Sequence, residues 1–379
     1  MVKLGEGIGE VSASKLTTFY GCPFAFFLQY VEHEQVEKSA HLVFGEAIHY
    51  QLEQFYKKNW KSKENFLKNW WYYWFQLIPK KYEKKIKFST PYKQKVLFSN
   101  IGIQITEEQA KNFSEKGFRI IKEGNLINMI NERPPRKLCY NVNFQKEQFK
   151  EIGIELPTSK ALELAEGGIR IETEQQIFFL IGMSILSKFW DRHRNRPAPF
   201  WYEKKFRAPI QVKQNGETKE YMLVGKFDRV DVINKKTIIT DYKTGFTDMD
   251  NPVQQEIFHR SLQFTLYSKA YRTISGEKEE GLLLYDLRKM KIYPTKRSEE
   301  DYRYLEQCIK SADARIIAQD FTPFYGFHCA WCDYIEPCAI RKIGVGNGIS
   351  SFIERMTSGR IYLEDKGLGS LLFSENLKE

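Results

Sequence analysis

The sequence predicts an α/β fold in which a β-sheet is flanked by helices and carries a large helical insertion. β-Branched and aromatic residues alternate with short polar turns from 201 to 243, a pattern typical of strands joined by hairpins. Apolar residues recur at helical spacing before residue 55, over 252–274 and over 298–318. The segment 56–200 has a mainly helical pattern.

These patterns predict five parts of the chain. Residues 1–55 form N-terminal helices, 56–200 a helical insertion or clamp, 201–320 the core, 321–342 a cysteine segment, and 343–379 a flexible linker and tail. Within the insertion, 107–127 and 172–194 are predicted helices. The aromatic run 69–75 indicates a buried helix, with base stacking as the alternative. The lysine-rich run 80–95 and the basic loop 192–196 are candidates for phosphate contacts.

The composition is that of a globular protein with an excess of positive charge. With 379 residues and 42% hydrophobic content, the chain can bury a sizeable core. The net charge of +10 is consistent with a polyanionic partner but does not identify one. No phosphate-binding G-x4-G-K-[ST] loop is present in the sequence, so a helicase motor would be a separate partner.

The sequence predicts no membrane association. Residues 1–9 lack the apolar stretch of a signal peptide. The longest apolar run, 177–186, is too short to span a bilayer. We therefore expect a soluble protein in the cytoplasm or on the nucleoid, of cellular, viral or plasmid origin.

The N-terminal helices carry two candidate ligands. Ser12 or Ser14 is expected to cap a first helix, and Pro23 fits the first turn of a second. Cys22 between them would by itself be a small buried residue. His49 lies on a helix whose apolar side includes residues 43, 47, 48, 52 and 55. A histidine there is more often packed or exposed than a ligand.

The hairpin 225–245 carries the residues around which the rest is arranged. Asp241 and Lys243 alternate onto one face of a strand, and Asp228 on the preceding strand can stand opposite them. Mg²⁺ and Mn²⁺ prefer oxygen ligands, and a nearby ammonium group stabilises developing negative charge. The trio therefore suits phosphodiester cleavage. A D-x-K pattern alone is more typical of a solvated hairpin.

Neighbouring elements are predicted to support this hairpin. Strands at 202–207, 211–213 and 221–224 precede it, and Glu203 indicates a cross-strand charge pair more than a ligand. Asp231 is predicted to be structural and paired with a basic neighbour. Gln263 and Tyr267 share one face of a helix over 252–274. Strands at 281–286 and 289–293 and a helix over 298–318 complete the core.

Three cysteines near residue 330 indicate a metal site. Cys329, Cys332 and Cys338 form a C-x2-C-x5-C pattern, and Cys22 can supply a fourth thiolate if the chain ends meet. Four thiolates hold zinc or an iron–sulfur cluster, and their spacing leaves both open. Cys139 and Cys308 are expected to be core residues, and His328 is a weaker ligand candidate.

Together these motifs resemble the RecB-family branch of the PD-(D/E)XK nuclease superfamily. The matching elements, in order, are G-x3-H at 45–49, G-K-F-D ending at Asp228, D-Y-K-T-G from Asp241, and Q-x3-Y at 263–267. The iron–sulfur members of the family, with one cysteine before the core and three after it, include the nuclease part of AddB, exonuclease V and the CRISPR adaptation nucleases. The resemblance implies a restriction-endonuclease-like core with a mixed central sheet.

The resemblance also implies site roles. His49, Asp228, Asp241 and the carbonyl of Tyr242 would hold Mg²⁺ or Mn²⁺. Lys243 would act beside the metal, while Gln263 and Tyr267 would position the substrate. The cysteines would hold a structural [4Fe–4S] cluster that joins the two ends of the core; the residues are Cys22, Cys329, Cys332 and Cys338.

The function expected from this resemblance is that of a metal-dependent deoxyribonuclease, a phosphodiester hydrolase. It would act as an exonuclease on single-stranded DNA or DNA ends, in repair, recombination or related processing. A separate helicase or recombination protein is a candidate partner. Two alternatives remain. One is a catalytically inactive nuclease-like module that binds or recruits DNA, and the other is a zinc-stapled RNA-processing nuclease.

Overall fold

The computed structural model describes residues 6–82, 86–87, 91–122, 141–214, 216–245, 249, 251–324, 326, 328–329, 332–335 and 337–338. The chain divides into two compact units. The first comprises residues 1–36 and 197–379, and the second comprises 37–196. Cys139 and the tail 343–379 lie outside the described residues, so the predictions for them stay predictions.

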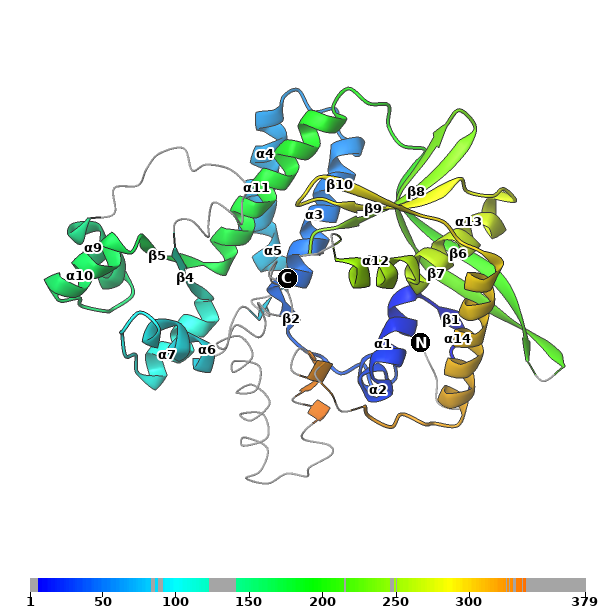
Figure 1. Cartoon of the computed structure of the whole chain (residues 1–379), viewed down its shortest axis with the longest axis horizontal. Helices are drawn as coiled ribbons and strands as arrows, with labels where there is room; N and C mark the ends of the chain where they lie inside the picture. Colours follow the sequence, from blue (N-terminus) through cyan, green and yellow to red (C-terminus); the bar gives the residue numbers. More distant parts are fainter. Residues whose placement is uncertain are drawn as a thin grey trace, which may run out of the picture. The chain divides into compact units, whose positions relative to one another are not determined.

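The first unit is built on a six-stranded mixed sheet (Figure 1). Its strand order is β1-β7-β8-β9-β10, and β6 pairs with β7. The β6–β7, β7–β8 and β9–β10 pairs are antiparallel, whereas β1–β7 and β8–β9 are parallel. The predicted mixed sheet flanked by helices is therefore confirmed. The strands are β1 (Glu10–Val11), β6 (Trp201–Gln214), β7 (Glu217–Ile233), β8 (Lys236–Lys243), β9 (Gly281–Asp286) and β10 (Lys291–Thr295).

Two tight turns set the register of the three strands that carry the predicted site. The β7–β8 turn consists of Asn234 and Lys235, whose φ angles of 51° and 62° match the left-handed conformation that two-residue hairpins require. In the β6–β7 hairpin, Gly216 adopts a φ of 84°, and the ladder pairs Trp201 with Val230 and Gln214 with Glu217. The strands predicted as separate pieces over 202–224 form one long continuous ribbon.

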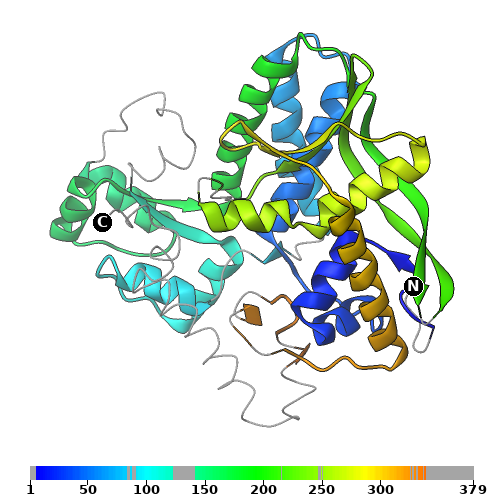
Figure 2. The ribbon, with the colours of Figure 1, turned by 45° about the vertical axis from the view of Figure 1, so that its right-hand side comes forward.

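Helices pack around this sheet. They are α1 (Ala13–Gly21), α2 (Pro23–Tyr30), α12 (Pro252–His259), α13 (Leu262–Ser275) and α14 (Glu299–Ile317). Ser12 caps α1 by accepting a hydrogen bond from the Lys15 amide, as one of the two predicted caps. Helices α1, α13 and α14 contact one another, and α13 and α14 contact the β6–β7 ribbon (Figure 2). They bury a single apolar core that includes Phe19, Phe227 and Leu305.

Two predicted helices are shorter than expected. The helix over 252–274 is broken at Arg260 and Ser261, because α12 ends at His259 and Ser261 starts the new helix α13. The helix over 107–127 ends at Lys116. Gly117 there adopts φ 63°, which terminates the helix, and a strand follows. The helix predicted over 172–194 is confirmed as residues 174–193.

The second unit holds one group of long helices and one smaller group. In the first, α11 contacts both α3 and α4 (Figure 1). The second surrounds the β4–β5 pair and has its own core. The elements are β2 (Lys38–Ser39), α3 (Ala40–Lys57), α4 (Lys63–Tyr72), η1 (Tyr73–Leu77), α5 (Ile78–Tyr82), β3 (Ile86–Lys87), α6 (Pro91–Ser99), α7 (Glu107–Lys116), β4 (Phe118–Lys122), α9 (Val142–Glu151), α10 (Thr158–Glu166), β5 (Ile169–Thr173) and α11 (Glu174–His193).

The aromatic run of the second unit is split between core and surface. Trp70 and Trp74 are buried and stacked on each other, and their indole N–H groups donate to backbone carbonyls of α11. Trp71 and Tyr72 on the same helix are about half exposed. Among the described helices, none combines the length and apolar character that a membrane crossing requires.

Candidate active site

The antiparallel register places three carboxylates in one row across β6, β7 and β8. Tyr202 pairs with Arg229 and Lys204 with Phe227, so Glu203 stands opposite Asp228. Arg229 pairs with Thr240, and one further step along the ladder sets Asp228 opposite Asp241. Adjacent strands lie about 4.8 Å apart, which brings the three acidic groups together on one face.

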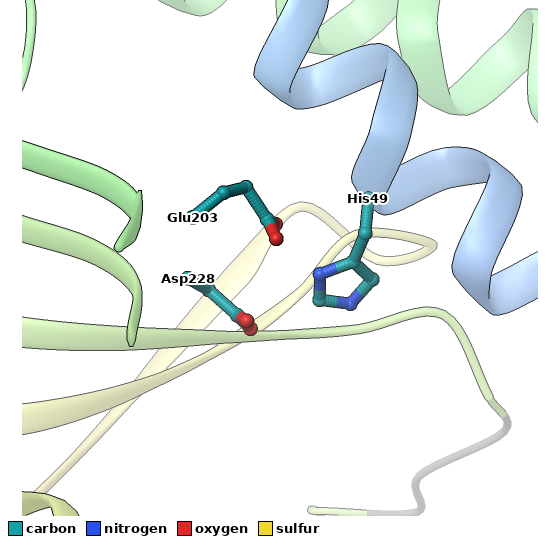
Figure 3. Close-up of side chains that lie close together, drawn as sticks. All are labelled: His49, Glu203 and Asp228. Carbon is teal, nitrogen blue, oxygen red and sulfur yellow. The ribbon is translucent and has the colours of Figure 1, made fainter. Parts of the chain in front are cut away.

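Glu203 and Asp228 are neighbours in this row. Carboxylate oxygens of the two residues lie within 4.8 Å of one another, and both side chains point to the same side (Figure 3). Glu203 has a φ of 47°, which a non-glycine residue in a strand adopts only at a cost. Asp228 is 6% exposed. Two buried, adjacent carboxylates repel each other, and a divalent cation between them would remove that repulsion.

Asp241 is held by a connected set of hydrogen bonds. The Gln263 amide nitrogen donates to Asp241 Oδ1 at 2.9 Å and to the Tyr267 hydroxyl at 2.9 Å. Lys243 Nζ lies 2.8 Å from Asp241 Oδ2 and donates to the Gln263 amide oxygen at 3.0 Å. The Q-x3-Y residues therefore fix the positions of both the carboxylate and the lysine on β8.

Tyr242 contributes through its backbone. Its amide N–H donates to Asp228 Oδ2 at 2.8 Å, which ties the two strands together where their ladder ends. Its buried ring packs near Tyr285, with the centroids 5.9 Å apart. A D-Y-K strand thus uses its middle residue to orient the carboxylate of the neighbouring strand.

The electrostatic environment keeps Lys243 charged. Burial acts to lower the pKa of this lysine, but the carboxylates of Asp241 and Asp228 outweigh it, so the pKa is raised. Tyr267 behaves as a neutral donor or acceptor, because burial and the same two carboxylates raise the pKa of its hydroxyl. At neutral pH the network consists of an ammonium group, carboxylates and neutral polar groups.

Gly225 explains the first position of the G-K-F-D motif. It pairs with Phe206 in the β6–β7 ladder, and a Cβ at this position would lie 2.6 Å from the Phe206 ring. That ring in turn packs on Phe227 at 4.4 Å and on Tyr267 at 5.9 Å. The glycine leaves room for the aromatic stack that supports Tyr267 and, through it, Gln263.

A large groove in the first unit reaches this network. It has a volume of about 1090 Å³ and is lined by Lys243 and Gln263, by the side chains of α12, and by α1 and the start of α14. Ile257 and Tyr304 line its walls and are 59% and 58% exposed. A long polymer strand could therefore reach the lysine from solvent.

The four predicted cysteine ligands lie around one small cavity. Cys22 at the start of α2 lines it together with Cys329, Cys332 and Cys338. Burial raises the pKa of the Cys332 thiol to about 11, and the charges of the other three cysteines act in the same direction. His328 also lines the cavity and lies 3.9 Å from the Cys329 sulfur. Cys308 is buried in α14, and its carbonyl accepts the Tyr20 hydroxyl.

Asp231 and Glu203 both form ion pairs, but only Glu203 also lies in the carboxylate row. Asp231 forms an ion pair with Arg229 at 2.6 Å, which agrees with its predicted structural role. Glu203 forms the predicted ion pair with Lys226, but it also belongs to the carboxylate row, which sequence reasoning had ranked low. The predicted turn at Asn215–Gly216 could have placed Glu203 opposite Asp228, because Glu203 precedes Asn215 by 12 residues and Asp228 follows Gly216 by 12.

His49 lies on α3 and is half-buried. This helix belongs to the second compact unit, whereas the carboxylate row belongs to the first. The predicted role of His49 as a ligand therefore stays a prediction.

Comparisons with known proteins identify the family. The PD-(D/E)XK nuclease superfamily matches residues 10–129 and 161–339. No curated protein matches the chain. A solved structure titled "Crystal structure of SSO0001" is 16% identical, covers 56% of this chain and 93% of its own, and aligns with a TM-score of 0.26. Since the matched residues make up well over half of the sequence, the chain belongs to the PD-(D/E)XK nuclease superfamily, whose members are generally nucleases.

Proposed function

We propose that this protein is a metal-dependent deoxyribonuclease of the RecB-like type that cleaves single-stranded DNA or DNA ends. The observation that carries the proposal is the carboxylate row Glu203–Asp228–Asp241 with Lys243 and Gln263 hydrogen-bonded beside it. A solvated hairpin would expose its aspartates to water, whereas Asp228 and Asp241 are 6% and 1% exposed, and burying neighbouring like charges is costly.

The residues of the row suit a divalent cation. Asp228 and Glu203 offer oxygens within 4.8 Å of each other, Asp241 is the next member, and His49 is proposed to add a nitrogen ligand. Oxygen-rich sites of this type select Mg²⁺ or Mn²⁺. The cation, when bound, would polarise the phosphate and lower the pKa of a bound water. The carbonyl of Tyr242 is the remaining proposed ligand.

Lys243 and Gln263 would act on the substrate from the groove side. The raised pKa of Lys243 keeps its ammonium group charged, so it can stabilise negative charge that develops on the phosphate or orient the attacking water. Gln263 holds this ammonium group in place, and Tyr267 holds Gln263. The geometry is fixed before substrate arrives, which reduces the reorganisation that the reaction requires.

The groove favours unpaired nucleotides. Ile257 and Tyr304 present exposed apolar and aromatic surface along its walls, and Arg260 adds a cation. Aromatic and apolar side chains beside cations stack the exposed faces of bases, which a duplex keeps hidden. This surface supports a preference for single strands or frayed ends.

Four cysteines line one small cavity, which is the number of thiolates that a zinc or iron–sulfur site takes. Cys22, Cys329, Cys332 and Cys338 come from opposite ends of the first unit and surround one space. We propose that they hold a structural [4Fe–4S] cluster, with zinc as the alternative, and that the bound group joins α2 to the segment after α14. Loss of the group would release this segment without touching the carboxylate row.

Cleavage of labelled substrates tests the proposed function. Purified protein would be mixed with end-labelled single-stranded DNA, duplex DNA and RNA of the same sequence, with Mg²⁺, Mn²⁺ or EDTA. We expect cleavage of single-stranded DNA that requires the metal and is lost in Asp241→Asn. Binding without metal-dependent cleavage would favour a recruitment module, and a preference for RNA would favour RNA processing.

Spectroscopy and metal analysis test the cluster. Anaerobically purified protein should be brown and contain iron and sulfide, and Cys332→Ser should lose the colour. Cys308→Ser is a matched control, because Cys308 lies away from the cavity on α14. Colourless protein with stoichiometric zinc would replace the cluster with a zinc site, whereas protein without bound metal would reject both.

A further inference from the structure

A row of lysines lies beside the row of carboxylates. On each of the three strands, the residue two positions from the carboxylate is a lysine: Lys205 follows Glu203 on β6, Lys226 precedes Asp228 on β7, and Lys243 follows Asp241 on β8. Because β7 runs antiparallel to both neighbours, all three steps go in the same direction in space. Residues two apart on a strand share a face, so each lysine lies on the face of its carboxylate.

The β6 and β7 members of this row stand directly opposite each other. Lys205 pairs with Lys226 in the ladder. Lys205 is exposed, and the Lys226 side chain is 44% exposed. Like charges in directly opposite positions destabilise a sheet, and the ion pair of Lys226 with Glu203 offsets only one of the two charges.

The cations continue along the same face of β6. Arg207 and Lys213 are exposed at even spacing from Lys205, while the alternate residues Ala208, Ile210 and Val212 are buried on the other face. From Lys205 to Lys213 the strand extends ~26 Å, which is long enough to follow several phosphates of one strand. Arg207 is paired with Glu10 and is still 64% exposed.

We propose that Lys226 and Lys205 each bind one of the two phosphates next to the scissile one, and that Arg207 and Lys213 extend this contact along the substrate backbone. The inference rests on the proposed function, because it assigns Lys243 to the scissile phosphate. The lysine row then matches consecutive phosphates of one strand, and the carboxylate row beside it matches the cation. The ion pair between Lys226 and Glu203 would break when the cation and the substrate bind, because Glu203 would then bind the cation and Lys226 a phosphate.

Salt-dependent binding tests the inference without requiring cleavage. The affinity for a fluorescein-labelled oligothymidine would be measured in EDTA over a KCl series. Each phosphate contact that is lost should make the slope of log K against log salt shallower by ~0.7 for a single strand. We expect this change in Lys226→Gln and in Lys205→Gln, about twice the change in the double variant, and recovery in Lys226→Arg.

Two matched variants sharpen the result. Lys235→Gln removes an exposed lysine in the β7–β8 turn, away from the row, and should keep the wild-type slope. Glu203→Gln should tighten binding in EDTA, because it removes the carboxylate that competes with phosphate for Lys226. Unfolding midpoints in urea would verify that all variants are folded.

The outcomes separate the inference from the proposed function. If wild-type protein binds and cleaves DNA while Lys226→Gln and Lys205→Gln keep its slope, the lysine pair does not contact phosphate and the inference is wrong. If wild-type protein neither binds nor cleaves any nucleic acid, the proposed function itself is wrong.

Discussion

Asp241 and Asp313 are both almost completely buried, and each lies beside a lysine, yet their surroundings differ. Asp313 on α14 is 0% exposed and accepts hydrogen bonds from the Ile8 amide at 2.9 Å, the Tyr221 hydroxyl at 2.8 Å and Lys219 at 2.7 Å. Asp241 is 1% exposed, and its partners Gln263 and Lys243 line the large groove.

The comparison shows how one fold uses the same chemical group in two ways. Asp313 joins three separate segments, and even a Cβ on Gly7 would lie 2.2 Å from its oxygen. Two of its donors, the Ile8 amide and the Tyr221 hydroxyl, belong to buried residues, and the third, Lys219, is partly exposed. Asp241 instead belongs to a row of like charges that a cation can stabilise. We therefore expect substitutions at Asp313 to lower stability and substitutions around Asp241 to lower turnover.

The largest expected effect is on the cleavage rate and follows from replacing Lys243, which lines the groove. Lys243→Met should lower the cleavage rate by about 10³-fold, because a charge aimed at the reacting phosphate acts in a site of low polarity. The unfolding free energy should also fall, because the buried Asp241 loses its charge partner, so the rate is expressed per folded molecule. Single-turnover cleavage and urea unfolding of the same preparation provide both values, and a rate near that of wild type would remove Lys243 from the mechanism.

Asp313→Ala should have the largest effect on stability. Removing this buried carboxylate leaves the Tyr221 hydroxyl and the Ile8 amide without their acceptor, and each buried polar group left unsatisfied costs about 1–3 kcal/mol. The cleavage rate per folded molecule should remain near the wild-type value. An unfolding curve like that of wild type would show that Asp313 does not hold the N-terminal segment in place.

Substitution of Gln263 tests the surroundings of Asp241, and its expected effect on activity is intermediate. Gln263→Leu removes the amide that holds both Asp241 and Lys243, and we expect a loss of about 10- to 100-fold in kcat/KM, as for other residues that orient ligands. Titration of Mn²⁺ should show a weaker apparent affinity as well. An isosteric Gln263→Glu change would repel Asp241 and should lower the rate further; equal activity in both variants would contradict the network.

Gly225→Ala should have the smallest effect of these substitutions. Gly225 lies on β7, the strand that carries both a member of the carboxylate row and a hydrogen-bond partner of Asp313. Its methyl group would press on the Phe206 ring, and overpacking of this kind costs about 1–3 kcal/mol. Adding Phe206→Leu should restore part of the lost stability by making room. Thermal unfolding of the single and double variants measures the coupling, and purely additive effects would show that the ring and the glycine do not interact.

Much of the site could be predicted because strand geometry is regular. Asp228, Asp241 and Lys243 were assigned from side-chain alternation, and Gln263 with Tyr267 from helical spacing; the structure joins them through direct hydrogen bonds. The position of Glu203 opposite Asp228 could also have been predicted, because Glu203 lies as far before the predicted Asn215–Gly216 turn as Asp228 lies after it. The lysine-rich composition of that strand concealed the signal.

Other features depend on tertiary packing that the sequence does not reveal. The break between α12 and α13 follows from the change of direction at Ser261, inside a stretch with continuous helical periodicity. The structural carboxylate Asp313 was not predicted at all, because its partners Ile8, Lys219 and Tyr221 lie about 90 to 300 residues away in the sequence. Contacts of that range leave no local pattern.

The most direct test compares the two buried aspartates in one measurement. Asp241→Asn and Asp313→Asn would be purified in parallel, and the Mn²⁺-dependent cleavage of single-stranded DNA would be normalised to the folded fraction of each sample. We predict that Asp241→Asn loses cleavage by at least about 10²-fold while Asp313→Asn stays near wild type. Equal activity of the two variants would contradict the assignment of the reactive site to the carboxylate row.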